Sequence, residues 1–258
     1  MHTRTSLKND LQHLGIQPGM ALIVHSSLKS IGDICGGVVA VILALEDVLG
    51  DQGTLVMPTH SAGLSDPAGW SSPPAPCDCI QQIRDEMPAY DADLTPTRKM
   101  GFLNETFRKQ RAVIRSSHPQ VSFAARGRYA QEICGAHSLD YGLGEGSPLA
   151  KLYALNGFVL LLGVDHSRNT SLHLAEHRLG TGQPKIRQRA PMMVNGQREW
   201  VEFDDIAVDD SDFLTIGADF ERDTELVRQG NVGDAVSKLM PQTALVDYAY
   251  KWMANKAR

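Results

Sequence analysis

The stretch FVLLLGVDHSRNTSLHLAEHR, residues 158–178, decides the fold prediction for this chain. Its first five residues are apolar, a run typical of a strand that is buried on both faces of a parallel sheet. Polar residues begin at Asp165, and LHLAEHRLG, further on, has the apolar spacing of an amphipathic helix that Thr170 or Ser171 can cap. Strand, polar turn and helix in this order indicate an α/β protein whose functional groups gather where the strand ends.

Two upstream segments repeat this pattern. ALIVHSS (21–27) and GTLVMPTHS (53–61) are predicted strands that end in polar residues, and GGVVAVILALEDVLG (36–50) is a predicted helix between them. SLKNDLQHLG is a predicted helix that begins at Ser6 and ends at Gly15. This alternation favours a mainly parallel sheet covered by helices on both faces.

The second half of the chain adds less regular elements. We predict a strand at VSFAARG (121–127), helices at ETFRKQ (105–110) and SPLAKLYALNG (147–157), and a hairpin at PMMVNGQREWVEF (191–203) around its Asn-Gly turn. The segment 213–258 is predicted to be helical. Residues 61–100 are rich in Pro, Ser and Gly, and such a long irregular insertion typically lies over a site. No repeat or composition shift divides the chain, so we expect one domain over residues 1–258.

The composition fits a globular chain with a sizeable core, since 42% of its 258 residues are hydrophobic and 21% are charged. The net charge of −5 gives non-specific nucleic-acid binding little electrostatic support. The N-terminus lacks the apolar centre of a signal peptide, and no apolar run approaches the roughly 20 residues that span a bilayer. We therefore expect a cytoplasmic protein with no nucleic-acid or membrane partner. Its cysteines are expected to be free thiols: Cys35, Cys77, Cys79 and Cys134.

Polar side chains follow each of the three apolar strands, as His25-Ser26-Ser27, Thr59-His60-Ser61 and Asp165-His166-Ser167. Because the carboxyl ends of parallel strands meet at one edge of a sheet, we expect these residues to surround a ligand. After the first strand, Gly36 and Gly37 precede a helix, where free backbone N–H groups favour an anion such as a phosphate. A tight turn without a ligand is the alternative, and the residues leave both open.

His173 is the candidate general base. It lies in the first turn of the predicted helix, where the helix dipole favours the neutral imidazole that a base requires. Glu176, three residues on, can orient the ring. His177 makes an H-x-x-x-H pair with His173, but Leu174 stands where a zinc protease has glutamate, and no third ligand follows at a recognisable distance. A buried structural histidine remains the alternative for each of these residues.

Six blocks of sequence together resemble one family: LIVHSSLKSIG, GTLVMPTHS, DADLTPTRKMGFLNETFR, RSSHPQVSFAARG, YGLGEGSPLAKLY and LLLGVDHSRNTSLHLAE. Their order and residues are similar to those of the antibiotic N-acetyltransferases typified by aminoglycoside 3-N-acetyltransferases. The resemblance implies a three-layer α/β/α sandwich with a mainly parallel or mixed central sheet. It also implies acetyl-CoA as co-substrate, no metal, and direct acetyl transfer to the 3-amine of a 2-deoxystreptamine ring, which gives antibiotic resistance.

The resemblance also implies roles for individual residues. His173 matches the catalytic base, and Asp66 matches an acidic position near the acceptor. We expect Glu176 to be the partner of His173, and Glu145 to face the acceptor as well. The residues matched to the CoA channel are His25, Ser26, Ser27, Ser30, Gly32, Thr59 and Ser122. The acceptor is then an aminoglycoside or another polycationic amine, the insertion 61–100 lies near the acceptor cleft, and the protein is a monomer or a homodimer.

One departure and three alternatives accompany this interpretation. The family commonly has Gly-His after the LLLGV strand, whereas this chain has Asp165-His166, and the extra carboxylate puts the acceptor preference in doubt. An acyl-CoA-dependent N-acyltransferase acting on a different amine is the nearest alternative. A CoA-binding protein without catalysis is the second. The third is a metal-dependent hydrolase that uses His60, His166, His173 and Asp66.

Overall fold

A computed structural model describes residues 1–180 and 184–256 of the chain. Within them a seven-stranded sheet has the order β3-β4-β2-β1-β5-β9-β8. The strands are β1 (Ala21–Ser26), β2 (Thr54–Pro58), β3 (Ile114–Arg115), β4 (Phe123–Gly127), β5 (Phe158–Leu162), β8 (Arg228–Val232) and β9 (Ala235–Pro241). A separate two-stranded hairpin is formed by β6 (Lys185–Val194) and β7 (Gln197–Ile206).

The sheet is mixed rather than mainly parallel. Its three central strands are parallel, because β1 pairs with β2 on one side and with β5 on the other. The flanking strands β4 and β9 run antiparallel to β2 and β5. The VSFAARG strand was therefore predicted in the right place, but its direction differs from that of the central strands. Since the three central strands are parallel, their carboxyl ends meet at one edge, as expected from the sequence.

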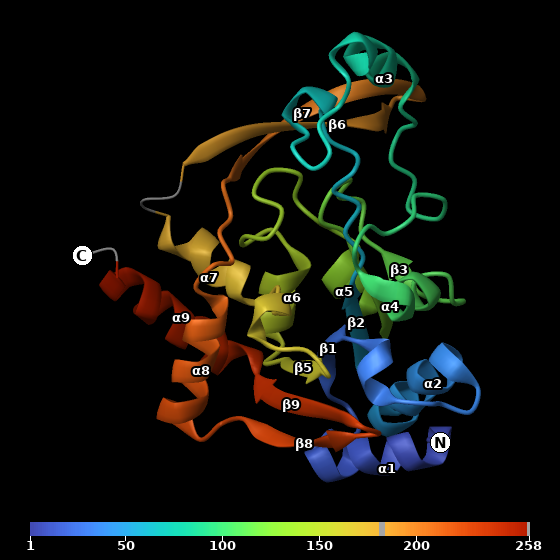
Figure 1. Cartoon of the computed structure of the whole chain (residues 1–258), viewed down its shortest axis with the longest axis vertical. Coiled ribbons are helices and arrows are strands. Elements are labelled where there is room, and N and C mark those ends of the chain that lie inside the picture. Colours follow the sequence, from blue (N-terminus) through green and yellow to red (C-terminus); the bar gives the residue numbers. More distant parts are fainter. Residues whose placement is uncertain (181–183, 257–258) are drawn as a thin grey trace.

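Helices cover both faces of the sheet, which confirms the three-layer sandwich (Figure 1). Alternate residues of β1 enter different cores: Leu22 and Val24 face one, Ile23 faces the other. The first core holds α1 (Arg4–Leu14), α2 (Gly37–Leu49) and α4 (Gly101–Phe107). The second holds α5 (Ala130–Cys134), α6 (Pro148–Ala154), α7 (Leu172–Leu179), α8 (Phe213–Thr224) and α9 (Gln242–Lys256).

Two details of the predicted helices need correction. Helix α1 begins after Thr3, not at Ser6: the two hydroxyls form a capping box in which each accepts a backbone N–H from the other residue. Its end at Gly15 is confirmed, with that residue in the left-handed conformation at φ 107°. Helix α6 ends at Ala154, with Leu155 as its C-cap, three residues before the predicted Gly157.

The prediction of an all-helical C-terminal segment is wrong for residues 228–241. Helices α8 and α9 are present, but β8 and β9 lie between them and extend the sheet beyond β5. β9 pairs along the whole of β5, from Phe158 opposite Pro241 to Leu162 opposite Ser237. Residues 257 and 258, at the end of the predicted helix, lie outside the described residues.

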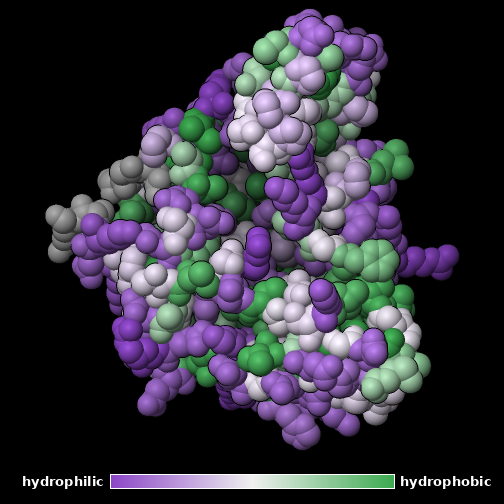
Figure 2. All heavy atoms as spheres, in the orientation of Figure 1, coloured by the Kyte–Doolittle hydropathy of each residue, from purple (hydrophilic) through white to green (hydrophobic). Residues whose placement is uncertain are grey.

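The insertion and the hairpin pack against each other at the end of the molecule away from α1 (Figure 1). Within 61–100 only one α-helix, α3 (Ile80–Glu86), is formed among the described residues. The Arg84 carbonyl of α3 accepts the Trp200 Nε1–H of β7 at 2.9 Å, and the Tyr90 N–H donates to the Pro191 carbonyl of β6 at 2.8 Å. Figure 2 shows that these two segments form a lobe, with the surface hollowed below it.

No helix of the described residues combines the length and the apolar character needed to cross a membrane.

Candidate active site

A cleft of about 800 Å³ lies at the carboxyl ends of β1, β2 and β5, and we call it the strand-end cleft. Its walls come from the segment after β1, from the start of α4 and from the turn after β5. They include His25, Ser26, Ser27, Lys29, Pro58, Lys99, Met100, Asn104, Gly163, Asp165, Arg168 and Thr170. The parallel arrangement of the three strands thus brings together residues that are up to 145 positions apart.

The residues predicted for a CoA channel divide into four groups. His25, Ser26 and Ser27 line the strand-end cleft. Ser30 lies behind them and donates a hydrogen bond to the Ser27 hydroxyl at 2.8 Å. Gly32 is outside the lining and ends the short 3-10 helix Leu28–Ile31, with φ 86°.

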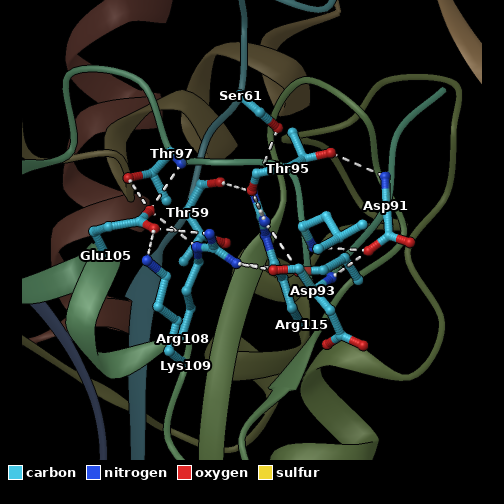
Figure 3. Close-up of polar contacts among 12 residues, drawn as sticks. Thr59, Ser61, Asp91, Asp93, Thr95, Thr97, Glu105, Arg108, Lys109 and Arg115 are labelled. Atoms are coloured by element: carbon cyan, nitrogen blue, oxygen red, sulfur yellow. Dashed lines mark hydrogen bonds and ion pairs between the residues drawn. The ribbon is translucent and has the colours of Figure 1, made fainter. Parts of the chain in front are cut away.

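Thr59 and Ser122, the remaining two, are fully buried and bonded to each other at 3.1 Å between their hydroxyl oxygens. Arg115 from β3 completes this cluster, and Figure 3 shows it between Thr59 and Thr95. Its guanidinium donates to the Ser122 hydroxyl at 3.1 Å and to the Thr59 carbonyl at 2.8 Å. It also donates to the Ala92 and Thr95 carbonyls of the insertion. The two hydroxyls therefore belong to a network that ties the insertion to the end of β2.

His173 and Glu176 contact each other at the start of α7. The His173 Nδ1–H donates to Glu176 Oε2, and the second carboxylate oxygen, Oε1, accepts the Asp209 backbone N–H at 2.9 Å. Glu176 is 2% exposed, so its carboxylate is held in place away from solvent. The imidazole packs on Phe213 of α8, with 4.8 Å between ring centroids. Because Nδ1 is engaged, Nε2 is the nitrogen available for a proton transfer.

Two further buried imidazoles lie close enough to His173 to feel its charge. Burial, followed by the proximity of His173, lowers the pKa of both His25 and His60 to about 3. Both side chains are therefore neutral at pH 7, and the Nε2 atom of each is buried without a hydrogen-bond partner among the described residues. The site thus keeps the uncharged nitrogens of His25 and His60 near His173.

The comparisons with known proteins identify the family. The family model described as aminoglycoside 3-N-acetyltransferase matches residues 23–254. This chain belongs to that family. It is 45% identical to the prophage-derived aminoglycoside N(3')-acetyltransferase-like protein YokD of Bacillus subtilis, with 98% of this chain and 93% of the relative covered. It is 35% identical to aminoglycoside N(3)-acetyltransferase IX of Micromonospora chalcea, with 99% and 95% covered.

Solved structures of this family have the same fold. The crystal structure of YokD superimposes with a TM-score of 0.97 at 44% identity, covering 99% of this chain and 94% of that one. AAC-IIIb, solved as a binary complex with CoASH, gives 0.88 at 31% identity, with 98% and 97% covered. AAC-VIa, solved with bound sisomicin, gives 0.87 at 27% identity, with 98% of each chain covered.

A second cleft of the acetyltransferase, of about 680 Å³, lies under the insertion, and we call it the insertion cleft. It shares Lys99, Met100 and Arg168 with the strand-end cleft. Trp70 lines it, and the indole is held by a hydrogen bond from Nε1 to the Ser65 hydroxyl at 3.0 Å. The cations of these clefts were not singled out in the sequence, since Lys29, Arg98, Lys99 and Arg168 form no motif.

Asp66 lines a third cleft, of about 600 Å³, between the insertion and β6, which we call the hairpin cleft. Its carboxylate is paired with two arginines. Arg84 donates at 3.0 and 3.1 Å, and Arg189 donates from Nε at 2.6 Å. Burial raises the pKa of Asp66, but the Ala68 N–H and the two guanidiniums outweigh it and leave that pKa lowered. Glu145, the other predicted acceptor residue, is exposed and pairs with Arg178 at 2.6 Å.

The residues proposed for a metal-dependent hydrolase do not form a ligand group. His166 is buried and engaged by Glu221 at 2.9 Å and by the Asn169 amide at 3.3 Å. Asp66 is occupied by its arginines, and residues 1–180 and 184–256 contain no cluster of three or more His, Cys, Asp or Glu side chains able to hold a metal ion. The hydrolase alternative with these four residues as metal ligands is therefore wrong. Asp165, the departure from the family pattern, accepts hydrogen bonds from Ser167 and caps the turn 166–168.

Proposed function

We propose that this protein transfers the acetyl group of acetyl-CoA to the 3-amine of a 2-deoxystreptamine aminoglycoside, with His173 as general base. The observation that carries the proposal is the Glu176 carboxylate between His173 and the Asp209 N–H. It sets the tautomer with the proton on Nδ1, which leaves the lone pair of Nε2 to accept a proton. A buried histidine with a purely structural role needs no buried carboxylate fixed on its far side.

The chemistry requires only a base and a positioned thioester. The neutral acceptor amine attacks the thioester carbonyl carbon, and His173 Nε2 takes a proton from the nitrogen as the N–C bond forms. The C–S bond then breaks, the electron pair leaves with the CoA sulfur, and the proton on His173 returns to that thiolate. The products are an amide and CoA thiol. A base in this position typically contributes about 100- to 10,000-fold to the rate.

The strand-end cleft is the proposed site of the acetyl donor. Ser26 and Ser27 line it as the family resemblance implies, and Thr170 brings it next to the start of α7. Lys29, Lys99 and Arg168 supply positive charge for the phosphates of CoA. The relative AAC-IIIb was solved with CoASH, which supports the same donor here.

The acceptor is proposed to enter from the insertion and hairpin clefts, toward the same histidine. The bound sisomicin of AAC-VIa supports an aminoglycoside acceptor for this chain. Asp66 and Glu145 stay as proposed acceptor contacts. Their arginine partners mean that an incoming ammonium group competes with charges of the protein itself.

The experiment is an acetylation assay with purified protein, acetyl-CoA and a panel that includes sisomicin and gentamicin C1a, measuring released thiol and locating the new amide by NMR. We expect acetylation at the 3-amine and a loss of about 100-fold or more in kcat for His173→Gln. His177→Gln is the matched control, because His177 lies one turn on in the same helix but faces Asp205 of the hairpin at 3.0 Å.

Each contrary result identifies which part of the proposed function fails: the base, the acceptor or the donor. Full activity of His173→Gln would show that His173 is not the general base. Thiol release with other amines but with no aminoglycoside would favour the same mechanism on a different acceptor. Failure to bind acetyl-CoA would overturn the donor assignment.

A further inference from the structure

The two arginines that contact Asp66 bring more positive charge than its single carboxylate can neutralise. Arg84 and Arg189 both contact this one carboxylate, so the three side chains together have a net charge of +1. The group is only partly exposed, with 24% of the Asp66 side chain and 31% of the Arg189 side chain accessible. Burial on this scale strengthens the pair relative to a fully solvated one.

The two arginines differ in position. Arg84 belongs to α3, and its own carbonyl is fixed by the Trp200 indole at 2.9 Å. Arg189 belongs to β6 and lines the hairpin cleft together with Asp66, whereas Arg84 does not line it. The Arg189 guanidinium also lies over the Trp200 ring, 5.4 Å from its centroid. Arg189 is therefore the cation that a ligand in this cleft meets at the carboxylate.

The Asp66 carboxylate does not need Arg189 to stay in place. Its Oδ1 accepts the Ala68 N–H at 3.1 Å and caps the turn 67–69. Arg84 holds both oxygens from the other side. Removal of the Arg189 charge leaves these contacts intact, and Oδ2 then has one guanidinium partner in place of two.

The adjoining insertion cleft has the same electrostatic character. It shares Ala62 and Gly69 with the hairpin cleft. Arg98, Lys99 and Arg168 line it with no carboxylate, and the other acid of the hairpin cleft, Glu202, is paired with Arg187 at 3.2 Å. A ligand with several ammonium groups therefore encounters carboxylates that are already paired and cations that repel it.

We infer that Arg189 is a specificity-determining residue: by pairing with Asp66 it withholds an ammonium-binding carboxylate, and so weakens the binding of acceptors with several ammonium groups relative to acceptors with fewer. This inference rests on the proposed function, since it concerns the acceptor of that reaction. Arg189 acts on acceptor binding and not on the proton transfer at His173. Its effect should therefore appear in KM and not in kcat.

The test compares the wild type with Arg189→Gln, using sisomicin as the acceptor. We expect the KM for sisomicin to fall at least threefold, with kcat and the KM for acetyl-CoA little changed. The advantage should shrink as NaCl is raised, because it is electrostatic. Asp66→Asn added to Arg189→Gln should restore the high KM, since the freed carboxylate is the cause.

Arg222→Gln is the charge-matched control. Arg222 is exposed on α8 and pairs with Asp219 and Asp223, so the substitution changes the net charge equally without touching the clefts. Thermal melts of each variant verify folding. An unchanged or raised KM in Arg189→Gln, or an equal drop in Arg222→Gln, overturns the inference.

Calorimetric titration of sisomicin into the same proteins tests the role of Arg189 separately from the proposed function. If the wild type releases no thiol with any aminoglycoside, the proposed function fails, and the titration still decides the role of Arg189. Tighter sisomicin binding by Arg189→Gln than by wild type supports it. Equal binding, or none by either protein, overturns it.

Discussion

Glu176 accepts one hydrogen bond on each of its two carboxylate oxygens, from the Nδ1–H of His173 on one and from the Asp209 N–H on the other. The first contact lies within one turn of α7. The second joins α7 to the segment between β7 and α8, 33 residues further along. The orientation of the imidazole thus depends on the packing of the whole second core, and on Phe213, which covers the ring.

Glu176→Gln should lower kcat about 100-fold while changing the KM for acetyl-CoA little. A glutamine has one acceptor oxygen for two donors, so either the ring or the Asp209 N–H loses its partner. Steady-state kinetics measures the effect, and a pH–rate profile reports the altered base. Asp209→Ala keeps the backbone N–H and should stay close to wild type. Equal losses in both variants would contradict the orienting role of Glu176.

Lys29→Gln should raise the KM for acetyl-CoA about three- to tenfold without a comparable change in kcat. Lys29 lines the strand-end cleft two residues after Ser27, where its ammonium can reach a phosphate of the donor. Initial rates at varied acetyl-CoA measure the change. Lys251→Gln on α9, an exposed position outside the clefts, is the control. A KM that does not respond to Lys29→Gln would place the phosphates elsewhere.

Arg115→Lys should destabilise the protein by about 2–4 kcal/mol and loosen residues 91–97. Arg115 donates to three carbonyl oxygens and two hydroxyls, a set that a lysine ammonium cannot span. Figure 3 shows Arg115 with Thr59, Ser61 and Thr95 around it. Urea unfolding gives the loss of stability, and hydrogen exchange should show faster exchange in the insertion. Lys109→Gln, whose side chain in the same view is 60% accessible, should cost no more than about 1 kcal/mol. Similar losses in both variants would mean that Arg115 does not anchor the insertion.

The sequence predicted those elements whose patterns are complete in themselves. Strand β5 is marked by its apolar run, helix α2 by the glycines at its two ends, and the hairpin by its Asn-Gly turn. Each of these elements is present in the structure. The strand β8 reads Arg-Gln-Gly-Asn-Val, with no apolar alternation, and it forms only because β9 offers it a paired edge. The direction of β4 likewise depends on topology and not on local pattern.

The contacts of the candidate site also divide into those that follow from local sequence and those that depend on the overall fold. His173 and Glu176 are three residues apart on one helix, so their contact follows from helical geometry. Asp66 and Arg189 are 123 positions apart and meet only because the hairpin packs on the insertion. The family resemblance places Asp66 near the acceptor, and only the folded structure reveals that two arginines already pair with it.

Stability should fall steeply as the pH drops below about 6.5, because four buried or partly buried histidines are neutral in the folded protein. Burial is the first cause in each case, and it lowers the pKa to about 3 for His25, His60 and His137 and to about 4 for His118. In the unfolded chain these groups titrate near pH 6.5. Below that pH the unfolded state binds more protons than the native state, so each histidine removes up to about 1.4 kcal/mol of stability per pH unit until its folded pKa is reached.

Denaturant unfolding between pH 8 and pH 5 measures this slope, and His60→Phe tests its origin. The Nε2 of His60 has no hydrogen-bond partner among the described residues, and the ring packs edge-on against Phe123 at 5.3 Å, so a phenyl ring can replace it without a lost bond. The variant should show a slope shallower by about 1.4 kcal/mol per pH unit and a higher stability at pH 5 than the wild type. An unchanged slope would mean that His60 is protonated to the same extent in the folded and unfolded chains.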